Sequence, residues 1–385
     1  MSGSRLVSLI FISFLMAASV NGQQGAGFVE QPKAREPFAS SRMKRQSKDA
    51  LFVPVASTQL SQDPQQSRSQ MPASGRTNCA YLGDALRATE LRVERNQRIV
   101  TTNSHPEGNS TTEDPKVLAV DLQYDLKVLE HDKAELDKCL AWNERSTAKP
   151  GPTKDCYSSE FFDFHVTHYD EPTHDVQVWR QPESSAFFFE SSLSVDADGA
   201  PDAYRPDNHG LDDLANAGAP GSWSGLAADK NGDPFIQGPD DPFPGYYVSS
   251  TALSDRTKAA NDPTRYVDAS RIPYIVLPEG IETQTGAHPG DLAEVFNLQN
   301  GKSSPAIYAD TGPVDRIGEG SVALAESLGL WSDARSGGTT RGILYLVFPG
   351  SGNGGPRPIE EINAGAEKLF QVWGGNNQLI ACGIR

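Results

Sequence analysis

Apolar residues recur every three or four positions in two stretches of the N-terminal third of the chain. This spacing is that of an amphipathic helix whose apolar side faces a partner. The polar residues 101–116 separate the two stretches and are long enough to reverse the chain. The pattern therefore predicts an antiparallel helical hairpin over residues 78–145. The expected apolar stripe holds Leu82, Leu86, Thr89, Val93 and Val100 with Asn96 in one slot, then Leu122, Leu126, Leu129, Leu136 and Leu140 with Lys133 in one slot.

After the linker 146–152 the pattern changes to brief apolar runs divided by Gly, Pro and Asp turns. Many short strands with turn signals between them are typical of a β-sandwich or a β-barrel. We therefore expect a mainly β domain over residues 153–385, with two helices at Ser321–Leu328 and Pro358–Trp373. The expected strands are Ala186–Ser194, Pro234–Gln237, Gly245–Ser249, Ile272–Leu277, Asp291–Phe296, Pro305–Asp310, Gly342–Phe348 and Gln378–Cys382.

The N-terminal region contains two segments that lie outside these domains. Residues 6–20 form an apolar run after Arg5, which is typical of a signal peptide and too short for a membrane-spanning helix. We expect residues 1–22 to be removed and the protein to be secreted. Residues 23–77 are rich in Gln, Ser, Pro and charge, which predicts a disordered linker or propeptide. Within it, Arg42 to Arg45 resemble a furin-type processing site.

The four cysteines predict two disulfides if the protein enters an oxidising compartment. Antiparallel packing of the hairpin would place Cys79 beside Cys139. Cys156 would then pair with Cys382 and tie the start of the next domain to its end. The two other pairings stay open, and a Cys139–Cys156 bridge across the linker is the main rival. The segment between the two helices carries an N-glycosylation sequon at Asn109.

The negative charge belongs to the C-terminal part of the chain. Residues 151–385 carry 33 acidic and 15 basic residues, a net charge of −18, against +2 for residues 1–150. A strongly negative domain repels nucleic acid and attracts cations. The charge therefore argues against a nucleic-acid partner, although it would also serve solubility alone.

Two carboxylates stand nine residues apart in the stretch AIYADTGPVDRIGEGSVALAESLGL, residues 306–330. The apolar run before Asp310 predicts a buried strand, and Ser321 is a candidate N-cap for a following helix. Glu319 lies between two glycines, which let other groups approach closely. The two acids are candidate partners in acid–base chemistry, and the alternative is a pair of surface acids in a loop.

Two familiar motifs do not fit their usual context. Asp310-Thr311-Gly312 resembles an aspartic-protease signature, but that chemistry needs two aspartates that share a proton, and the chain holds no second copy. The glycines of PGSGNGGP, residues 349–356, satisfy G-x-G-x-x-G, but prolines bracket them and no acid lies at the right distance for a ribose. We interpret this stretch as a loop.

Several aromatic residues stand in Gly- and Ser-rich surroundings. They are Trp223, Tyr246, Tyr247 and Trp331. Flat rings stack on sugar faces, whereas Tyr and Trp also occur in cores, so both interpretations stay open.

A chain of motifs closely resembles the chitosanases of glycoside hydrolase family 75. The resemblance covers residues 187–380 and includes FFFESSLSVDADGAPDAY (187–204), LDDLANAGAPGSW (211–223), GPDDPFPGYYVSSTAL (238–253) and AIYADTGP with IGEGSVALAESLG (306–329). Residues 23–150 show no such counterpart.

The resemblance implies an endo-acting, inverting hydrolase of β-1,4-linked glucosamine polymers. Asp310 and Glu319 occupy the positions of the family's essential acids, and we expect Glu319 to be the general acid and Asp310 the general base. The family fold implies a compact barrel of the double-psi type, and no metal or organic cofactor. The expected substrate-binding residues are Asp196, Asp198, Asp202, Trp223, Tyr246 and Tyr247.

The expected partner is chitosan, a cationic polysaccharide, with no nucleic-acid or membrane partner. We expect a monomer, and the hairpin would be the surface for any self-association. The alternative function is a catalytically weak chitosan-binding protein in which the hairpin is an interaction module. The presence of both catalytic acids argues against that alternative.

Overall fold

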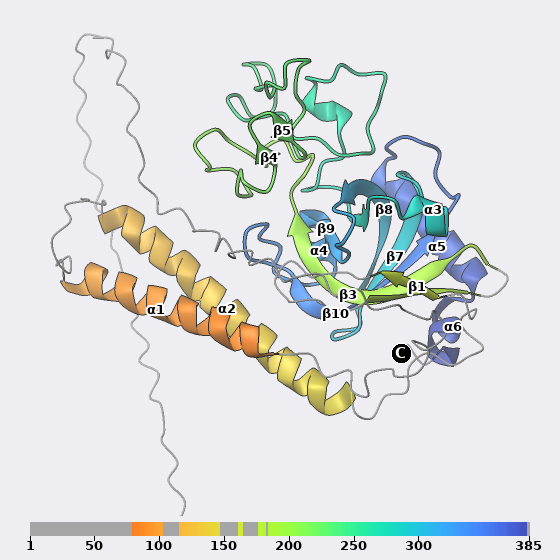
Figure 1. Ribbon diagram of the computed structural model, residues 1–385, viewed down its shortest axis with the longest axis horizontal. Helices are drawn as coiled ribbons and strands as arrows, with labels where there is room; N and C mark the ends of the chain where they lie inside the picture. The colour runs from red at the N-terminus through yellow and green to blue at the C-terminus, as the bar shows by residue number, and fades with distance from the viewer. Residues whose placement is uncertain (1–78, 103–114, 147–160, 165–175, 182–183, 383–385) are drawn as a thin grey trace, which may run out of the picture. The chain divides into compact units, whose positions relative to one another are not determined.

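The computed structural model of the 385-residue chain (Figure 1) describes residues 79–102, 115–146, 161–164, 176–181 and 184–382. The predicted signal peptide, the segment 23–77, the processing site, the sequon at Asn109, the linker and Cys156 lie outside the described residues. Within the described part of the chain, no helix is long and apolar enough to cross a membrane.

The predicted helical hairpin is present, as α1 (Ala80–Thr102) and α2 (Pro115–Ser146). On α1 the buried residues include Leu82, Thr89 and Val93, as the heptad pattern predicts. Towards its end the buried position is Ile99, and Val100 is exposed. Cys79 and Cys139 form the predicted disulfide, with their Cα atoms 5.9 Å apart.

The leucine stripe expected on the second helix is wrong in part. Leu126 and Leu140 are 44% and 50% exposed, whereas the acidic residue Asp125 is buried. Hydrogen bonds account for the difference, because Asp125 accepts them from Asn96 at 2.8 Å and from Arg92 at 3.2 Å. Buried polar groups that find partners across the hairpin can occupy positions that periodicity assigns to leucines.

The mainly β part of the chain forms a closed barrel, which confirms the expected fold class. Among the described residues, six strands run around the barrel in the order β3-β10-β7-β8-β6-β9, and β9 returns to pair with β3. Two further strands, β1 and β2, extend the sheet beyond β3. The bounds are β1 (Phe161–Phe164), β2 (Val176–Arg180), β3 (Phe187–Asp196), β6 (Tyr274–Pro278), β7 (Leu292–Asn297), β8 (Ser303–Gly312), β9 (Glu319–Ser321) and β10 (Thr339–Phe348).

The pairing within the barrel is mixed. β3 runs parallel to β9 and β6 runs parallel to β8, while the other neighbours are antiparallel. Large apolar side chains fill the centre, where Phe189 of β3 stacks on Tyr345 of β10 with ring centroids 4.7 Å apart. The strands β3, β6, β7, β8 and β10 correspond to apolar runs in the sequence, whereas β1, β2 and β9 are strands that the sequence did not predict.

Helices cover the barrel strands. The two expected helices are α4 (Val322–Ser327) and α5 (Ile359–Trp373), and a short α3 (Glu282–Thr285) precedes β7. Phe370 of α5 packs on Phe296 of β7 with centroids 5.3 Å apart. Ser321 caps α4 by accepting the Leu324 N–H at 3.1 Å, as the sequence predicts.

The strand expected at Gln378–Cys382 is wrong, because these residues belong to the helix α6 (Gly375–Ala381) and its C-cap. Gly374 and Gly375 both have positive φ, which ends α5 and lets the chain turn into a second short helix. Leu379 and Cys382 are buried at helical spacing, but so short an apolar run does not distinguish a strand from a helix. Cys382 is disulfide-bonded.

A long irregular segment, residues 197–273, connects β3 to β6 and is green to teal in Figure 1. It contains the two-residue strands β4 (Gly218–Ala219) and β5 (Ser222–Trp223) and the turn η2 (Pro263–Arg265). The strands expected at 234–237 and 245–249 occur only as isolated bridges, such as Ile236 with Tyr247. The many Gly, Pro and Asp residues favour turns over long ladders.

Candidate active site

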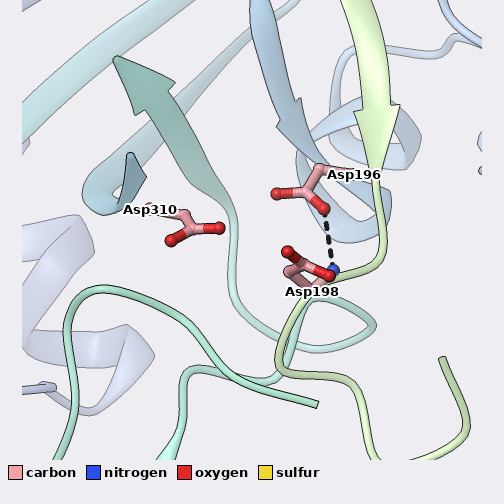
Figure 2. A group of neighbouring side chains, drawn as sticks. All are labelled: Asp196, Asp198 and Asp310. Carbon is pink, nitrogen blue, oxygen red and sulfur yellow. Dashed lines mark hydrogen bonds between the residues drawn. The ribbon is translucent and has the colours of Figure 1, made fainter. Parts of the chain in front are cut away.

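The acidic residues of the site begin at the end of β3. Asp196 is the last residue of that strand and is 7% exposed. Its carboxylate accepts the Asp198 N–H at 2.8 Å and the Tyr274 hydroxyl at 2.9 Å. The turn that follows β3 therefore brings the carboxyl of Asp198 next to that of Asp196, and Figure 2 shows both with the connecting hydrogen bond.

Asp198 is held by the irregular segment that follows β3. It accepts a hydrogen bond from the Tyr204 hydroxyl at 2.8 Å. Gly225 lies against it, and a Cβ there would fall 2.5 Å from an Asp198 oxygen. Only a residue without a side chain lets the backbone come so close to the carboxyl.

Asp310 reaches the site from β8 through an irregularity in strand pairing. Tyr308 pairs with Ile275 of β6, but the next partner, Val276, pairs with Asp310, so Ala309 is an extra residue. Such a bulge redirects the strand and often lies beside an active site. The Asp310 carboxylate accepts the Ala252 N–H at 2.8 Å.

The three aspartates Asp196, Asp198 and Asp310 converge. Each offers one oxygen, and these oxygens all lie within 4.8 Å of one another. Figure 2 shows the three carboxyls directed into the same space between the end of β3 and β8. This spacing suits a divalent cation, an ammonium group or carboxyls that share protons.

Glu319 opens β9, between β3 and β6. It pairs with Ser194 of β3 and with Val276 of β6. Gly318 before it has a φ of 100°, and a Cβ there would lie 2.5 Å from the Ser191 hydroxyl oxygen, so glycine is required. Among the described residues, no hydrogen bond to the Glu319 carboxyl is found. The structure thus places Asp310 and Glu319 on strands that flank the same residue.

Burial raises the pKa of each of the four carboxyls Asp196, Asp198, Asp310 and Glu319. In the last three, the charge of Asp196 raises the pKa further. The pKa of Asp310 rises to about 8, although the Ala252 and Thr311 N–H groups lower it in part. The pKa of Glu319 is raised well above its usual range by burial, Asp196, Asp310 and Asp212. The site therefore holds protons that isolated carboxyls would lose.

A further acid, Asp212, belongs to this network and was missed by sequence reasoning. It is 3% exposed and accepts hydrogen bonds from Asn216 at 2.9 Å and from the Tyr204 hydroxyl at 3.3 Å. Burial raises the pKa of Asp212 to about 7. Tyr204 has one hydroxyl proton and two carboxyl neighbours, Asp198 and Asp212. The LDDLANAG motif contains Asp212 and Asn216, but nothing local in it indicates that Tyr204 links Asp212 to the cluster.

The candidate sugar-stacking residues separate into different places. Trp223 and Tyr247 lie together, with centroids 6.4 Å apart. The Tyr247 N–H donates to the backbone oxygen of Tyr204 at 2.9 Å, so this pair adjoins the acidic network. Tyr246 instead packs on Phe243 and lies under the Arg205 guanidinium.

Two other candidates lie outside the acidic cluster. Trp331 contacts the hairpin, with its ring centroid 5.0 Å from that of His131. Asp202 lies near Asp268. Burial is the main cause that raises the pKa of Asp268, and the charge of Asp202 raises it further. Neither belongs to the set of three converging carboxyls.

Comparison with models of known protein families gives a match over residues 245–373. This part of the chain includes β6 to α5 and both Asp310 and Glu319, whereas Asp196, Asp198 and Asp212 precede it. No curated protein matches the chain. Residues 245–373 match the family model of the fungal chitosanases of glycosyl hydrolase group 75, and this match confirms the family resemblance that the sequence motifs indicated.

Proposed function

We propose that this protein is a secreted chitosanase that cleaves β-1,4-linked glucosamine polymers with inversion. The family match supports a glycoside hydrolase that acts on chitosan. The observation that carries the proposal is the placement of Asp310 and Glu319, from two strands, on either side of one β6 residue. Inverting hydrolysis needs one protonated carboxyl and one carboxylate separated by space for a water molecule.

The placement of the two acids on either side of β6 is consistent with inversion. Neighbouring strands lie about 4.8 Å apart, so the Cα atoms of Asp310 and Glu319 are roughly 10 Å apart across β6. Carboxyls about 6.5–9.5 Å apart leave room for the attacking water, and a retaining pair lies only about 5 Å apart.

The surroundings of the two acids support different roles. Asp310 accepts hydrogen bonds from backbone N–H groups, which favour its carboxylate form. Glu319 has no such donor among the described residues, and burial beside other acids favours its protonated form. Glu319 would protonate the leaving oxygen, and Asp310 would remove a proton from water on the opposite face of the sugar. The cationic substrate would itself lower the raised pKa of Asp310 and so favour its ionised form once the sugar chain is bound.

The acidic cluster and the aromatic pair suit a cationic sugar chain. Asp196 and Asp198 would bind an ammonium group of glucosamine, and Trp223 with Tyr247 would stack on a sugar face. Tyr246 is the weaker candidate, since it already packs under Arg205. Attraction between an acidic cleft and a polycation falls as salt rises. None of these steps requires a metal or an organic cofactor.

Secretion and a monomeric state complete the proposal. The apolar run at residues 6–20 supports a signal peptide, and the Cys79–Cys139 disulfide fits an oxidising compartment. Glycosylation at Asn109 is consistent with the same route.

The test is hydrolysis of soluble chitosan, measured by new reducing ends and by proton NMR of the freshly formed anomer. Inversion of a β-linkage gives the α-anomer first, and we expect that anomer to precede mutarotation. First release of the β-anomer would contradict the inverting mechanism. Binding of chitosan without new reducing ends would favour the alternative of a chitosan-binding protein.

A further inference from the structure

A cavity of about 570 Å³ lies between two loops of the mainly β domain. One wall is formed by residues 254–258 of the long irregular segment, together with Thr264. The other is formed by residues 353–358, the glycine-rich loop before α5. The volume is within the usual range of small-molecule sites, about 300–1,000 Å³. The glycine-rich loop, which does not fit the dinucleotide-binding motif, thus forms one wall of this cavity.

The cavity is lined by three cations and one acid, in a part of the chain that is strongly negative. The cations are Arg256, Lys258 and Arg357, and the acid is Asp255. Two of the cations are held by protein oxygens. Lys258 donates to the backbone oxygen of Thr264 at 2.8 Å, and Arg357 donates to that of Gly290 at 2.5 Å. Lys258 also lies 4.0 Å from the Asp255 carboxylate and is neutralised by it, so Arg256 and Arg357 leave the cavity wall positive.

The cavity wall follows directly in sequence from Ala252, which donates a hydrogen bond to the proposed base Asp310. Ala252 donates its N–H to Asp310, and Leu253 donates to the backbone oxygen of Ala309 at 2.8 Å. Ser254, the next residue, already lines the cavity. Two residues of extended chain span roughly 7 Å. A polymer cleaved at Asp310 would place a neighbouring sugar of the same chain at this cavity.

The cavity and the acidic cluster differ in the sign of their charge. On the side of β3 lie Asp196, Asp198 and Asp212, whereas the cavity carries three cations against one acid. An ammonium group gains from the first surroundings and loses in the second. An acetylated sugar carries no charge, so the cavity imposes no such penalty on it. Ser254, Thr257 and Asn353 offer hydroxyl and amide groups to an uncharged sugar.

We propose that this cavity is a sugar subsite which takes a neutral N-acetylglucosamine unit in preference to a charged glucosamine unit. The proposal rests on the proposed function, because it deepens the specificity of the same cleft. It makes the enzyme selective for partly acetylated chitosan, with an acetylated sugar at a fixed distance from the cleaved bond. Arg256 is the specificity residue, since it is exposed at the cavity and adds positive charge there.

The first experiment digests partly acetylated chitosan and sequences the products by mass spectrometry from both new ends. We expect the acetylated unit to be enriched at one fixed position, on one side of the cleaved bond only. Arg256→Gln should reduce that enrichment about two- to fivefold, the worth of one exposed charge near a glucosamine ammonium group at the high dielectric of the protein surface. Arg271→Gln, which changes an exposed arginine outside the cavity, is the matched control. Random acetylation at every position, or an unchanged pattern in Arg256→Gln, would overturn the proposal.

A second experiment keeps the proposal testable without turnover. NMR titration of the Glu319→Gln variant compares N-acetylglucosamine and glucosamine oligosaccharides. If that variant does not fold, the wild-type protein is titrated with the corresponding disaccharides. We expect the neutral sugars to shift the amides of Thr257 and Gly354 at lower concentration than the charged ones. Equal or stronger shifts with glucosamine would refute the subsite. Absence of hydrolysis with the expected titration would instead contradict the proposed function alone.

Discussion

Asp310 on β8 and Glu319 on β9 both pair with Val276, from the two sides of β6. Residues that share a partner in a sheet lie at the same level along the strands. The two acids therefore lie level with each other and are separated by the width of β6. This relationship fixes the geometry on which the proposed chemistry depends.

Loss of either acid should abolish most of the turnover. We expect Glu319→Gln and Asp310→Asn each to lower kcat on chitosan by at least about 10²-fold, the usual worth of a positioned acid or base. Glu279→Gln, which changes an exposed acid at the end of β6, should leave kcat unchanged. Circular dichroism checks that each variant folds. Near-normal kcat in a folded variant would remove that residue from the proposed pair.

Stability should be greatest at acidic pH. The pKa of Asp212 is raised to about 7 and that of Asp310 to about 8, so the folded state binds protons that the unfolded state releases near pH 4. This stabilisation is complete below about pH 4 and is lost as the pH rises through about 7 to 8. We expect Tm to fall over that window, and to fall less in Asp212→Asn. A Tm that rises from pH 4 to pH 7 would contradict the raised pKa values.

Tyr204 should influence activity although it is 1% exposed. Its hydroxyl lies between Asp198 and Asp212, so Tyr204→Phe removes the group that links the two carboxyls. We expect kcat to fall and its pH profile to shift, because the protonation of Asp198 would change. Tyr266→Phe is the control, because the Tyr266 hydroxyl donates to the backbone oxygen of Ala260 and lies outside the network. A lower Tm with an unchanged pH profile would indicate a packing role only.

A shortened chain that begins at Lys154 should fold and cleave chitosan, because the charge pattern changes at the linker before it. Removal of the hairpin also removes hydrogen bonds between α2 and β10, which should lower the stability of the shortened chain. The Glu135 carboxylate of α2 accepts hydrogen bonds from the Thr339 hydroxyl and the Thr340 N–H of β10, both at 2.9 Å. We therefore expect a lower Tm than for the full chain, with kcat retained. A shortened chain that is unfolded by circular dichroism would show that the hairpin is part of the hydrolase core.

The elements that the sequence predicts are those with a strong local pattern. Apolar runs identify β3, β6, β7, β8 and β10, and Asp310 and Glu319 stand out because each lies in a distinctive turn. Distant residues determine what was missed. β9 forms a strand only because β3 and β6 pair with it on its two sides. Asp212 enters the site because Tyr204 joins it to Asp198. On α2, Asp125 is buried because its partners lie on α1.

The extra residue Ala309 in β8 determines which of the following side chains lies beside Val276. Side chains alternate along a strand, so a shift of one residue turns each of them to the opposite face. Without the bulge, Ala309 would stand opposite Val276, and Asp310 would move one step along β6 to Leu277. A change of chain length by one residue before Asp310 would thus separate the two acids without altering either of them. Insertions and deletions in this strand should be far less tolerated than substitutions.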